Sequence, residues 1–223
     1  MHIDNTKTNI YDQSNPWTIR TFEPHTSLLA PYYNEKPFKV GFVIGRFQTI
    51  HLGHEKMINK ALELCSRVIV LVGSAQEEGT LRNPYSYETR ADLINEIYEN
   101  KPVSVSFIDD MTHENDHSHE WGRYLLNRVS QVATDLGLPD PEVMIYGNDE
   151  ERSLWFDPSD IENLNHVIIG RSDLSISATK NRDFMVRDNY WKWKQNTNPK
   201  IHEHFKELRQ ALLEIPEYKE MLK

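Results

Sequence analysis

The feature that most limits the fold is a pair of short apolar runs, residues 39–44 and 67–72, separated by one helix-length segment. Both runs are rich in valine and isoleucine and lack the polar alternation of strands that expose one face to water. Such strands are typical of a parallel sheet covered by helices on both faces. Between them, apolar residues recur at helical spacing: Met57, Ile58, Ala61, Leu62 and Cys65. The segment therefore predicts a strand, a helix and a second strand.

The same alternation continues along the chain. The spacing predicts helices over residues 87–99 and 119–136, and strands over residues 103–108, 142–146 and 166–169. Repeated units of this kind imply an α/β fold with a doubly wound, mainly parallel sheet. In such sheets ligands bind beyond the carboxyl ends of the strands, so the loops that follow the strands should converge on one site.

Residues 1–37 differ from the remainder of the chain. They are polar, contain four prolines and show neither helical nor strand periodicity. We expect an extended arm, which could wrap the domain, reach a neighbouring subunit, or be a variable tail without chemistry.

Two further parts complete the expected organisation. An α/β domain is predicted over residues 38–190, and residues 191–223 are predicted to form a helical tail that packs on this domain. Within the tail, residues 201–213 are amphipathic, and Pro216 should break the helix. Two tryptophans, Trp191 and Trp193, are expected to pack the tail against the domain.

Composition excludes several classes of function. The chain has 25 basic and 34 acidic residues, a net charge of −9, which argues against broad nucleic-acid binding. Cys65 is the single cysteine, so intramolecular disulfides and multi-cysteine zinc sites are excluded. No apolar run approaches the ~20 residues of a membrane-spanning helix, and the N-terminus lacks the features of a secretory signal. We therefore expect a cytoplasmic protein with no membrane contact.

The stretch GRFQTIHLGH lies directly behind the first predicted strand. Gly45 lets the backbone approach a ligand closely, and the next helix should begin near Gly53 with its free amides facing the same crevice. His51 and His54 can present both imidazoles on one side, and Arg46 adds a permanent charge. The pattern predicts a small cradle for phosphate.

A second stretch, residues 176–182 (ISATKNR), has related properties. Ser177 is a good N-cap for a following helix, which would leave Thr179 and the helix amides to hold phosphate oxygens while Arg182 adds charge. Two phosphate cradles, far apart in sequence, would then close on one nucleotide.

These residues resemble a known family. HLGH resembles the H-x-G-H signature of the nucleotidyltransferase superfamily, ISATKNR fits its I-S-x-T-x-x-R element, and GRFQ is similar to the version in archaeal-type nicotinamide-mononucleotide (NMN) adenylyltransferases. The resemblance covers roughly residues 38–190 and implies a Rossmann-like nucleotidyltransferase fold. It extends to GSAQ, LRNPYSYETR, Asp109-Asp110, Trp121 and YGN. Thr49 is a departure, since relatives commonly have proline there.

The resemblance implies an enzyme of NAD biosynthesis or salvage that joins ATP and NMN to give NAD and pyrophosphate, with Mg²⁺ carried by ATP and no dedicated protein metal site. The implied catalytic residues are Arg46, His51 and His54. The implied ATP-binding residues are Gly45, Arg46, Phe47, His51, His54, Gly147, Asn148, Ile176, Ser177, Thr179 and Arg182. The implied NMN-binding residues are Arg82, Asp110 and Trp121.

Other interpretations stay open. The acceptor could be phosphopantetheine, riboflavin phosphate, glycerol phosphate or nicotinic acid mononucleotide, or the chain could be a nucleotide-binding regulatory module without turnover. His113, His117 and His119 lie among carboxylates and could suggest a metal site, although a solvated loop is the simpler interpretation. Relatives commonly form oligomers, so a homo-oligomer is also possible.

Overall fold

The computed structural model describes residues 36–113, 115–147, 152–170 and 176–222. Within this part of the chain, five parallel strands form one sheet in the order β3-β2-β1-β4-β5. The strands are β1 (Phe38–Gly45), β2 (Cys65–Val72), β3 (Val103–Phe107), β4 (Val143–Gly147) and β5 (Asn165–Ile169). The first strand therefore lies at the centre, where the strand order reverses, and in such sheets this is the position of the ligand crevice.

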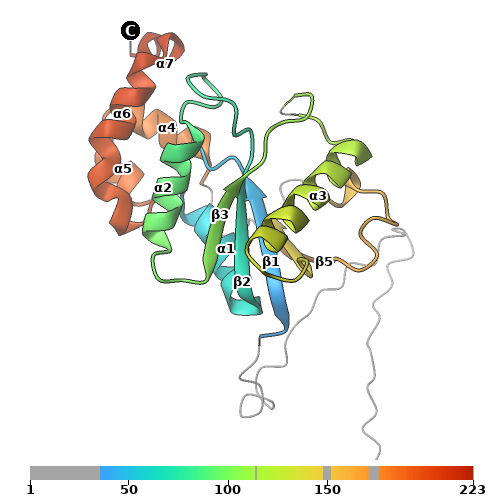
Figure 1. Cartoon of the computed structure of the whole chain (residues 1–223). Helices are drawn as coiled ribbons and strands as arrows, with labels where there is room; N and C mark the ends of the chain where they lie inside the picture. Colours follow the sequence, from blue (N-terminus) through green and yellow to red (C-terminus); the bar gives the residue numbers. More distant parts are fainter. Residues whose placement is uncertain (1–35, 114, 148–151, 171–175, 223) are drawn as a thin grey trace, which may run out of the picture.

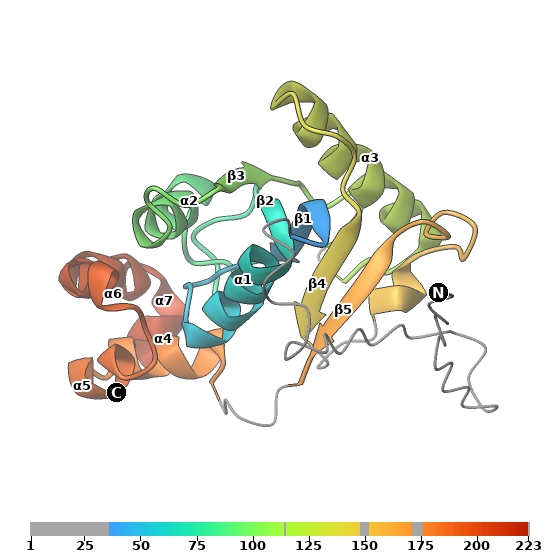
Figure 2. The same cartoon turned by 90° about the horizontal axis from the view of Figure 1, so that it is seen from below.

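Helices cover both faces of the sheet, as Figure 2 shows most clearly. One face carries α1 (Leu52–Leu64) and α2 (Tyr87–Ile97), and the other carries α3 (His119–Asp135) with the short 3₁₀ helix η1 (Arg152–Trp155). The described residues thus confirm the doubly wound, parallel α/β fold expected from the strand pattern.

The C-terminal helices lie beside α1 and α2, on the same side of the sheet (Figures 1 and 2). They are α4 (Ala178–Val186), α5 (Tyr190–Lys194), the 3₁₀ helix η2 (Pro199–His204), α6 (Phe205–Glu214) and α7 (Pro216–Glu220).

The sheet separates two apolar cores, because successive side chains of a strand point to opposite faces. In β1, Val43 belongs to the core under α1, α2 and the C-terminal helices. Its neighbours Phe42 and Ile44 belong to the core under α3. All three are buried, which explains why β1 lacks polar alternation.

The predicted tail differs from the structure in three places. Residues 199–204 form a 3₁₀ helix, so the amphipathic α-helix begins only at Phe205. Pro216 does end that helix, but it also opens α7, since proline is favourable at the first helical position. Trp193 is fully buried as expected, whereas the prediction for Trp191 was wrong because its side chain is 71% exposed.

The arm predicted over residues 1–37 lies outside the described residues, apart from Lys36 and Pro37. No helix among the residues that the structure describes is both long and apolar enough to cross a bilayer.

Candidate functional site

A cavity of about 420 Å³ opens at the carboxyl ends of β1 and β4. Its wall includes residues from both predicted phosphate motifs, although more than a hundred positions separate them in the sequence. The predicted site residues that line it are Gly45, Arg46, Phe47, His51, His54, Arg82, Asp110, Trp121, Gly147, Ile176, Ser177, Thr179 and Arg182. Asn148 lies outside the described residues. The structure therefore brings every described residue of the predicted set to one cavity.

The two histidines of the first motif stack on each other. Their ring centroids lie 3.8 Å apart with an angle of 21° between the ring planes. His51 is the N-cap of α1, and its Nδ1 accepts a hydrogen bond of 3.1 Å from the amide of Gly53. In the neutral ring the proton must then be on Nε2, so His51 offers a donor from the nitrogen that does not serve the cap.

Gly53 is required by this cap. A Cβ atom built at position 53 would lie 2.9 Å from Cε1 of His51 and 3.0 Å from its Nδ1. The contact with Cε1 is closer than real Cβ atoms approach, so a side chain here would displace the His51 ring. The glycine in HLGH thus positions the first histidine.

The second motif begins a helix that faces the same cavity. Ser177 caps α4 by accepting from the amide of Lys180 at 3.2 Å, and residues 176–179 line the cavity. Because the first amides of a helix have no partner within the helix, the start of α4 favours an anion.

Arg182, one turn into α4, connects the two motifs. Its guanidinium donates through Nη1 to the carbonyl of Gln48, in the loop after β1, and through Nη2 to Thr179 Oγ1 at 3.4 Å. Its Nε donates to the hydroxyl of Tyr218 at 2.6 Å. Only 7% of Arg182 is exposed, yet it lines the cavity, so the cation is held in place before any ligand arrives.

Arg90 was not among the residues expected from sequence, although the LRNPYSYETR block contains it. This fully buried side chain reaches from α2 and donates to the carbonyls of Arg46, Gly73 and Ser74, at 3.0, 2.9 and 3.2 Å. Burial lowers the pKa of its guanidinium to about 10, which leaves it charged at neutral pH. Arg90 therefore ties the loops after β1 and β2 together beneath the cavity.

The part of the cavity wall formed by the loops after β2 and β3 and by α3 carries the residues that the resemblance assigns to the acceptor. Asp110 accepts from Ser74 Oγ at 3.1 Å and from Gln76 Nε2 at 3.2 Å. Arg82 donates through Nη2 to Asn115 Oδ1 at 2.9 Å. These contacts hold the loops after β2 and β3 against each other.

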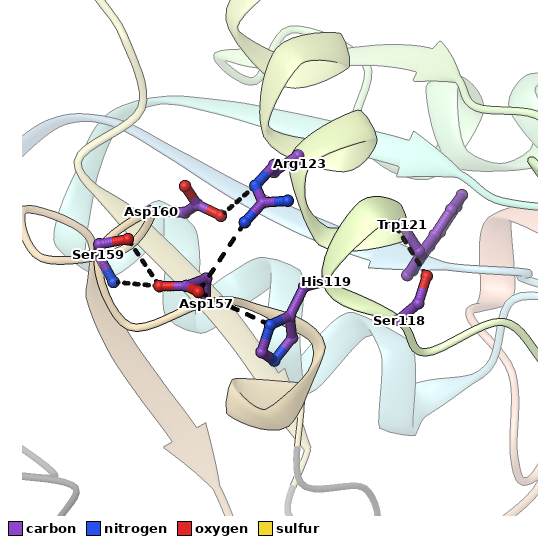
Figure 3. Close-up of polar contacts among 7 residues, drawn as sticks. All are labelled: Ser118, His119, Trp121, Arg123, Asp157, Ser159 and Asp160. Carbon is purple, nitrogen blue, oxygen red and sulfur yellow. Dashed lines mark hydrogen bonds and ion pairs between the residues drawn. The ribbon is translucent and has the colours of Figure 1, made fainter.

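Trp121 lies in the first turn of α3, whose N-cap Ser118 accepts from the Trp121 amide at 3.1 Å. Figure 3 shows Trp121 on the side of α3 opposite to Arg123 and His119. Arg123 pairs there with Asp160 at 2.8 Å. The polar contacts thus fasten the outer side of α3, and the indole is left to form part of the cavity wall.

A second aromatic group next to Trp121 was not expected. Trp155 of η1 lines the cavity, with the His117 ring stacked on it at 5.0 Å and the Arg152 guanidinium 5.0 Å from its ring centroid. Gly122 permits this, because a Cβ there would lie 2.1 Å from the Trp155 carbonyl oxygen. No sequence period marks a four-residue 3₁₀ helix, so the contact could be found only in three dimensions.

Carboxylates are few in the described wall of the cavity, where Asp110 and Asp116 are found. Hydrogen bonds from Thr112 and Ser118 lower the pKa of the Asp116 carboxyl to about 2. Among the described residues, the side chains whose ligand atoms lie close enough together to hold one metal ion are Glu96, Glu203 and His204. These three residues do not line the cavity. His204 Nε2 and Glu96 Oε2 are already paired at 2.6 Å.

The sequence pattern of the Cytidylyltransferase-like family matches residues 42–201, which is most of the chain and includes both motifs. The chain belongs to this family. The match begins inside β1 and ends in η2, so it covers the second half of β1 and the other four strands but not α6 and α7.

Curated proteins similar to this chain include archaeal nicotinamide-nucleotide adenylyltransferases. The protein of Picrophilus torridus is 27% identical over 151 residues, which cover 68% of this chain and 82% of that protein. The protein of Saccharolobus solfataricus is 38% identical over 68 residues, which cover 30% of this chain and 40% of the relative. The chain thus spans two fifths of that relative.

Solved structures with the same fold are more distant in sequence. A bifunctional NMN adenylyltransferase/ADP ribose pyrophosphatase of Francisella tularensis, complexed with AMP and a manganese ion, has a TM-score of 0.56 and 20% identity. That comparison covers 82% of this chain and 51% of the other. A putative nicotinate-nucleotide adenylyltransferase of Vibrio parahaemolyticus has a TM-score of 0.52 and 14% identity, with 77% and 99% covered. At such identities the likeness establishes the fold alone.

Proposed function

We propose that this chain is an adenylyltransferase that joins ATP and NMN to give NAD and pyrophosphate. The observation that carries the proposal is the convergence of the starts of α1 and α4 on one cavity, with His51, His54 and Arg182 in its wall. The archaeal relatives named as nicotinamide-nucleotide adenylyltransferases support the choice of acceptor.

The reaction places few chemical demands on the protein. An oxygen of the NMN 5′-phosphate attacks the α-phosphorus of ATP, a new P–O bond forms, and the bond to the β-phosphate oxygen breaks. Pyrophosphate leaves with the electrons of that bond. The nucleophile is already an anion, so the rate must come from alignment and from stabilising charge in the transition state.

The residues of the cavity match this demand. His51 and His54 would donate hydrogen bonds to the ATP phosphates, and Arg46 and Arg182 would stabilise the charge that develops on pyrophosphate. Arg182 has five N–H groups, of which three are engaged by Tyr218, Gln48 and Thr179, so it keeps donors for a phosphate.

The acceptor would lie against the part of the cavity wall that carries Arg82, Asp110 and Trp121. Trp121 would stack on the flat cationic nicotinamide ring, whose attraction to the electron-rich indole face is a cation–π interaction. Arg82 and Asp110 would contact the remainder of NMN. Gly147 lines the cavity where the adenine side would close.

Mg²⁺ would enter bound to ATP. The small number of carboxylates in the described cavity wall fits an ion held mainly by phosphate oxygens and water, since magnesium usually takes few protein ligands.

The test is product formation from defined acceptors. Purified protein with ATP and Mg²⁺ should convert NMN to NAD and release one pyrophosphate for each NAD formed. Parallel reactions should contain nicotinic acid mononucleotide, phosphopantetheine, riboflavin phosphate or glycerol phosphate. Turnover of one of the last three without NAD formation would reject the acceptor, and ATP binding without any turnover would favour a regulatory module.

A further inference from the structure

Helix α7 is joined to the cavity wall through one side chain, Tyr218, which bonds to the wall residue Arg182. Among the five residues of this helix, Tyr218 alone is buried, with 4% of its surface exposed. A five-residue helix is not stable alone, so α7 depends on this anchor for its place.

The Tyr218 hydroxyl lies between α4 and the loop after β2. It accepts from Arg182 Nε at 2.6 Å and donates to the carbonyl of Leu81 at 2.7 Å. Burial raises the pKa of the Tyr218 phenol, so the hydroxyl keeps the proton that it donates to Leu81. The Arg182 guanidinium polarises the hydroxyl to which it donates, so the bond from Arg182 and the bond to Leu81 strengthen each other.

The two partners of Tyr218 belong to different halves of the site. Arg182 comes from the second phosphate motif, while Leu81 precedes Arg82 on the wall assigned to the acceptor. Tyr85 reinforces the link, because its hydroxyl donates to the carbonyl of Leu208 in α6 at 3.0 Å. Tyr85 and Gln48 also exchange two hydrogen bonds, of 3.1 and 3.0 Å, which fix the loop after β1.

We propose that Tyr218 is a positioning residue for the reaction, and that the segment beyond the family match, α6 and α7, completes the site by holding Arg182 and the Leu81–Arg82 loop at fixed distance. This proposal rests on the proposed function. Tyr218 is not assigned a substrate contact, because the contacts described for its hydroxyl are with protein groups and it does not line the cavity.

Tyr218→Phe tests the proposal by steady-state kinetics. The variant keeps the ring and removes the hydroxyl, so Arg182 loses a charge-assisted partner. We expect kcat/KM for ATP to fall about tenfold through a higher KM, since hydrogen bonds to charged groups contribute this much. Loss of folded protein would lower the apparent kcat but leave KM unchanged, because KM does not depend on enzyme concentration.

Tyr98→Phe is the matched control. Tyr98 is similarly buried, its hydroxyl contacts Asn59 at 3.2 Å and the Glu55 carbonyl at 3.4 Å, and it does not line the cavity. Its variant should keep the wild-type KM for ATP. Equal KM values in wild-type protein and both variants would overturn the proposal.

A second measurement needs no variant. If the docked C-terminal segment favours ATP binding, ATP must favour docking by the same factor. Deuterium uptake by residues 216–222 of the wild-type protein should therefore slow about tenfold when α,β-methylene ATP and Mg²⁺ are added. Uptake that is unchanged by a saturating analogue would overturn the proposal. This readout involves no NAD, so it separates failure of the inference from failure of the proposed function.

Discussion

Residues of the first motif have two separate roles: they fix the start of α1, and they present hydrogen-bond donors to the cavity. His51 uses Nδ1 to cap α1, whereas His54 lies one turn on, stacks on His51 and packs at a tilt against Phe47. The H-x-G-H spacing is what places one ring over the other at the start of the helix. Preorganised donors of this kind stabilise a transition state without rearrangement during the reaction.

His54→Ala should therefore lower kcat by about 10²-fold or more, because it removes one preorganised donor. The fold should be retained, since the residue lies at the cavity rather than in an apolar core. Turnover should be measured together with the circular dichroism spectrum. Wild-type turnover in the folded variant would contradict the role of His54.

Glu55, next to His54, provides a prediction of pH dependence. It is buried, and burial raises the pKa of its carboxyl above the ordinary value of 4.5, although Asn198 donates to it at 2.7 Å. As the pH rises through 4.5, the unfolded chain loses its proton before the folded protein does, so the folded state loses stability until the raised pKa is passed.

Glu55→Gln removes this charge and keeps an acceptor for Asn198. We expect a higher Tm than wild type at pH 7 and a smaller difference at pH 4.5 and below, where the wild-type carboxyl is protonated. Thermal melts across this range provide the measurement. A difference that grows toward low pH would show that the sign is wrong.

At the scale of elements, the site depends on strand ends being held together by groups from neighbouring helices. Arg90 of α2 does this for the loops after β1 and β2, through three carbonyls in one buried fork. Lysine cannot reproduce that geometry, because its ammonium is a point charge on a flexible stem.

Arg90→Lys should cost about 3 kcal/mol of unfolding free energy, since carbonyls would be left buried without partners. It should also lower kcat/KM, because the Arg46 loop would lose its support. Arg128→Lys is the control: this arginine also donates to a strand carbonyl, that of Phe107 at 2.9 Å, but it does so at the exposed surface. Denaturant melts in which both variants lose the same stability would contradict the role of Arg90.

The sequence predicts a helix or strand where a local hydrophobic pattern or a helix N-cap is enough to define it. Strands β1 and β2 were evident from buried runs, and α4 was evident from the Ser177 cap. The part of the site made by Arg90, Trp155 and Tyr218 could not be predicted in this way, because those side chains act on backbone groups or rings far away in the sequence. Tyr218, for example, bonds to Leu81 across 137 positions. No local pattern contains that information.

At the scale of the whole molecule, the C-terminal helices share one apolar core with the sheet. Trp193, Phe205 and Leu208 belong to the same cluster as Val43 of β1 and Ile58 of α1. We therefore expect the sheet and these helices to unfold in a single transition.

Two nearby tryptophans test this expectation. Trp193→Ala should cost roughly 3–5 kcal/mol, because it leaves a large cavity in that core. Trp191→Ala, at a side chain that is 71% exposed, should change the unfolding free energy by less than about 0.5 kcal/mol. Urea melts followed by circular dichroism provide both values. Similar losses from the two substitutions would contradict a shared core.

Two distant segments of the chain are proposed to hold one triphosphate, and the rest of the mechanism depends on this. A crystal structure with α,β-methylene ATP, Mg²⁺ and NMN tests it most directly. We expect the triphosphate to lie between the first turns of α1 and α4, within hydrogen-bond distance of both His54 and Arg182. Phosphates that contact only one of these residues, or that bind outside this cavity, would contradict it.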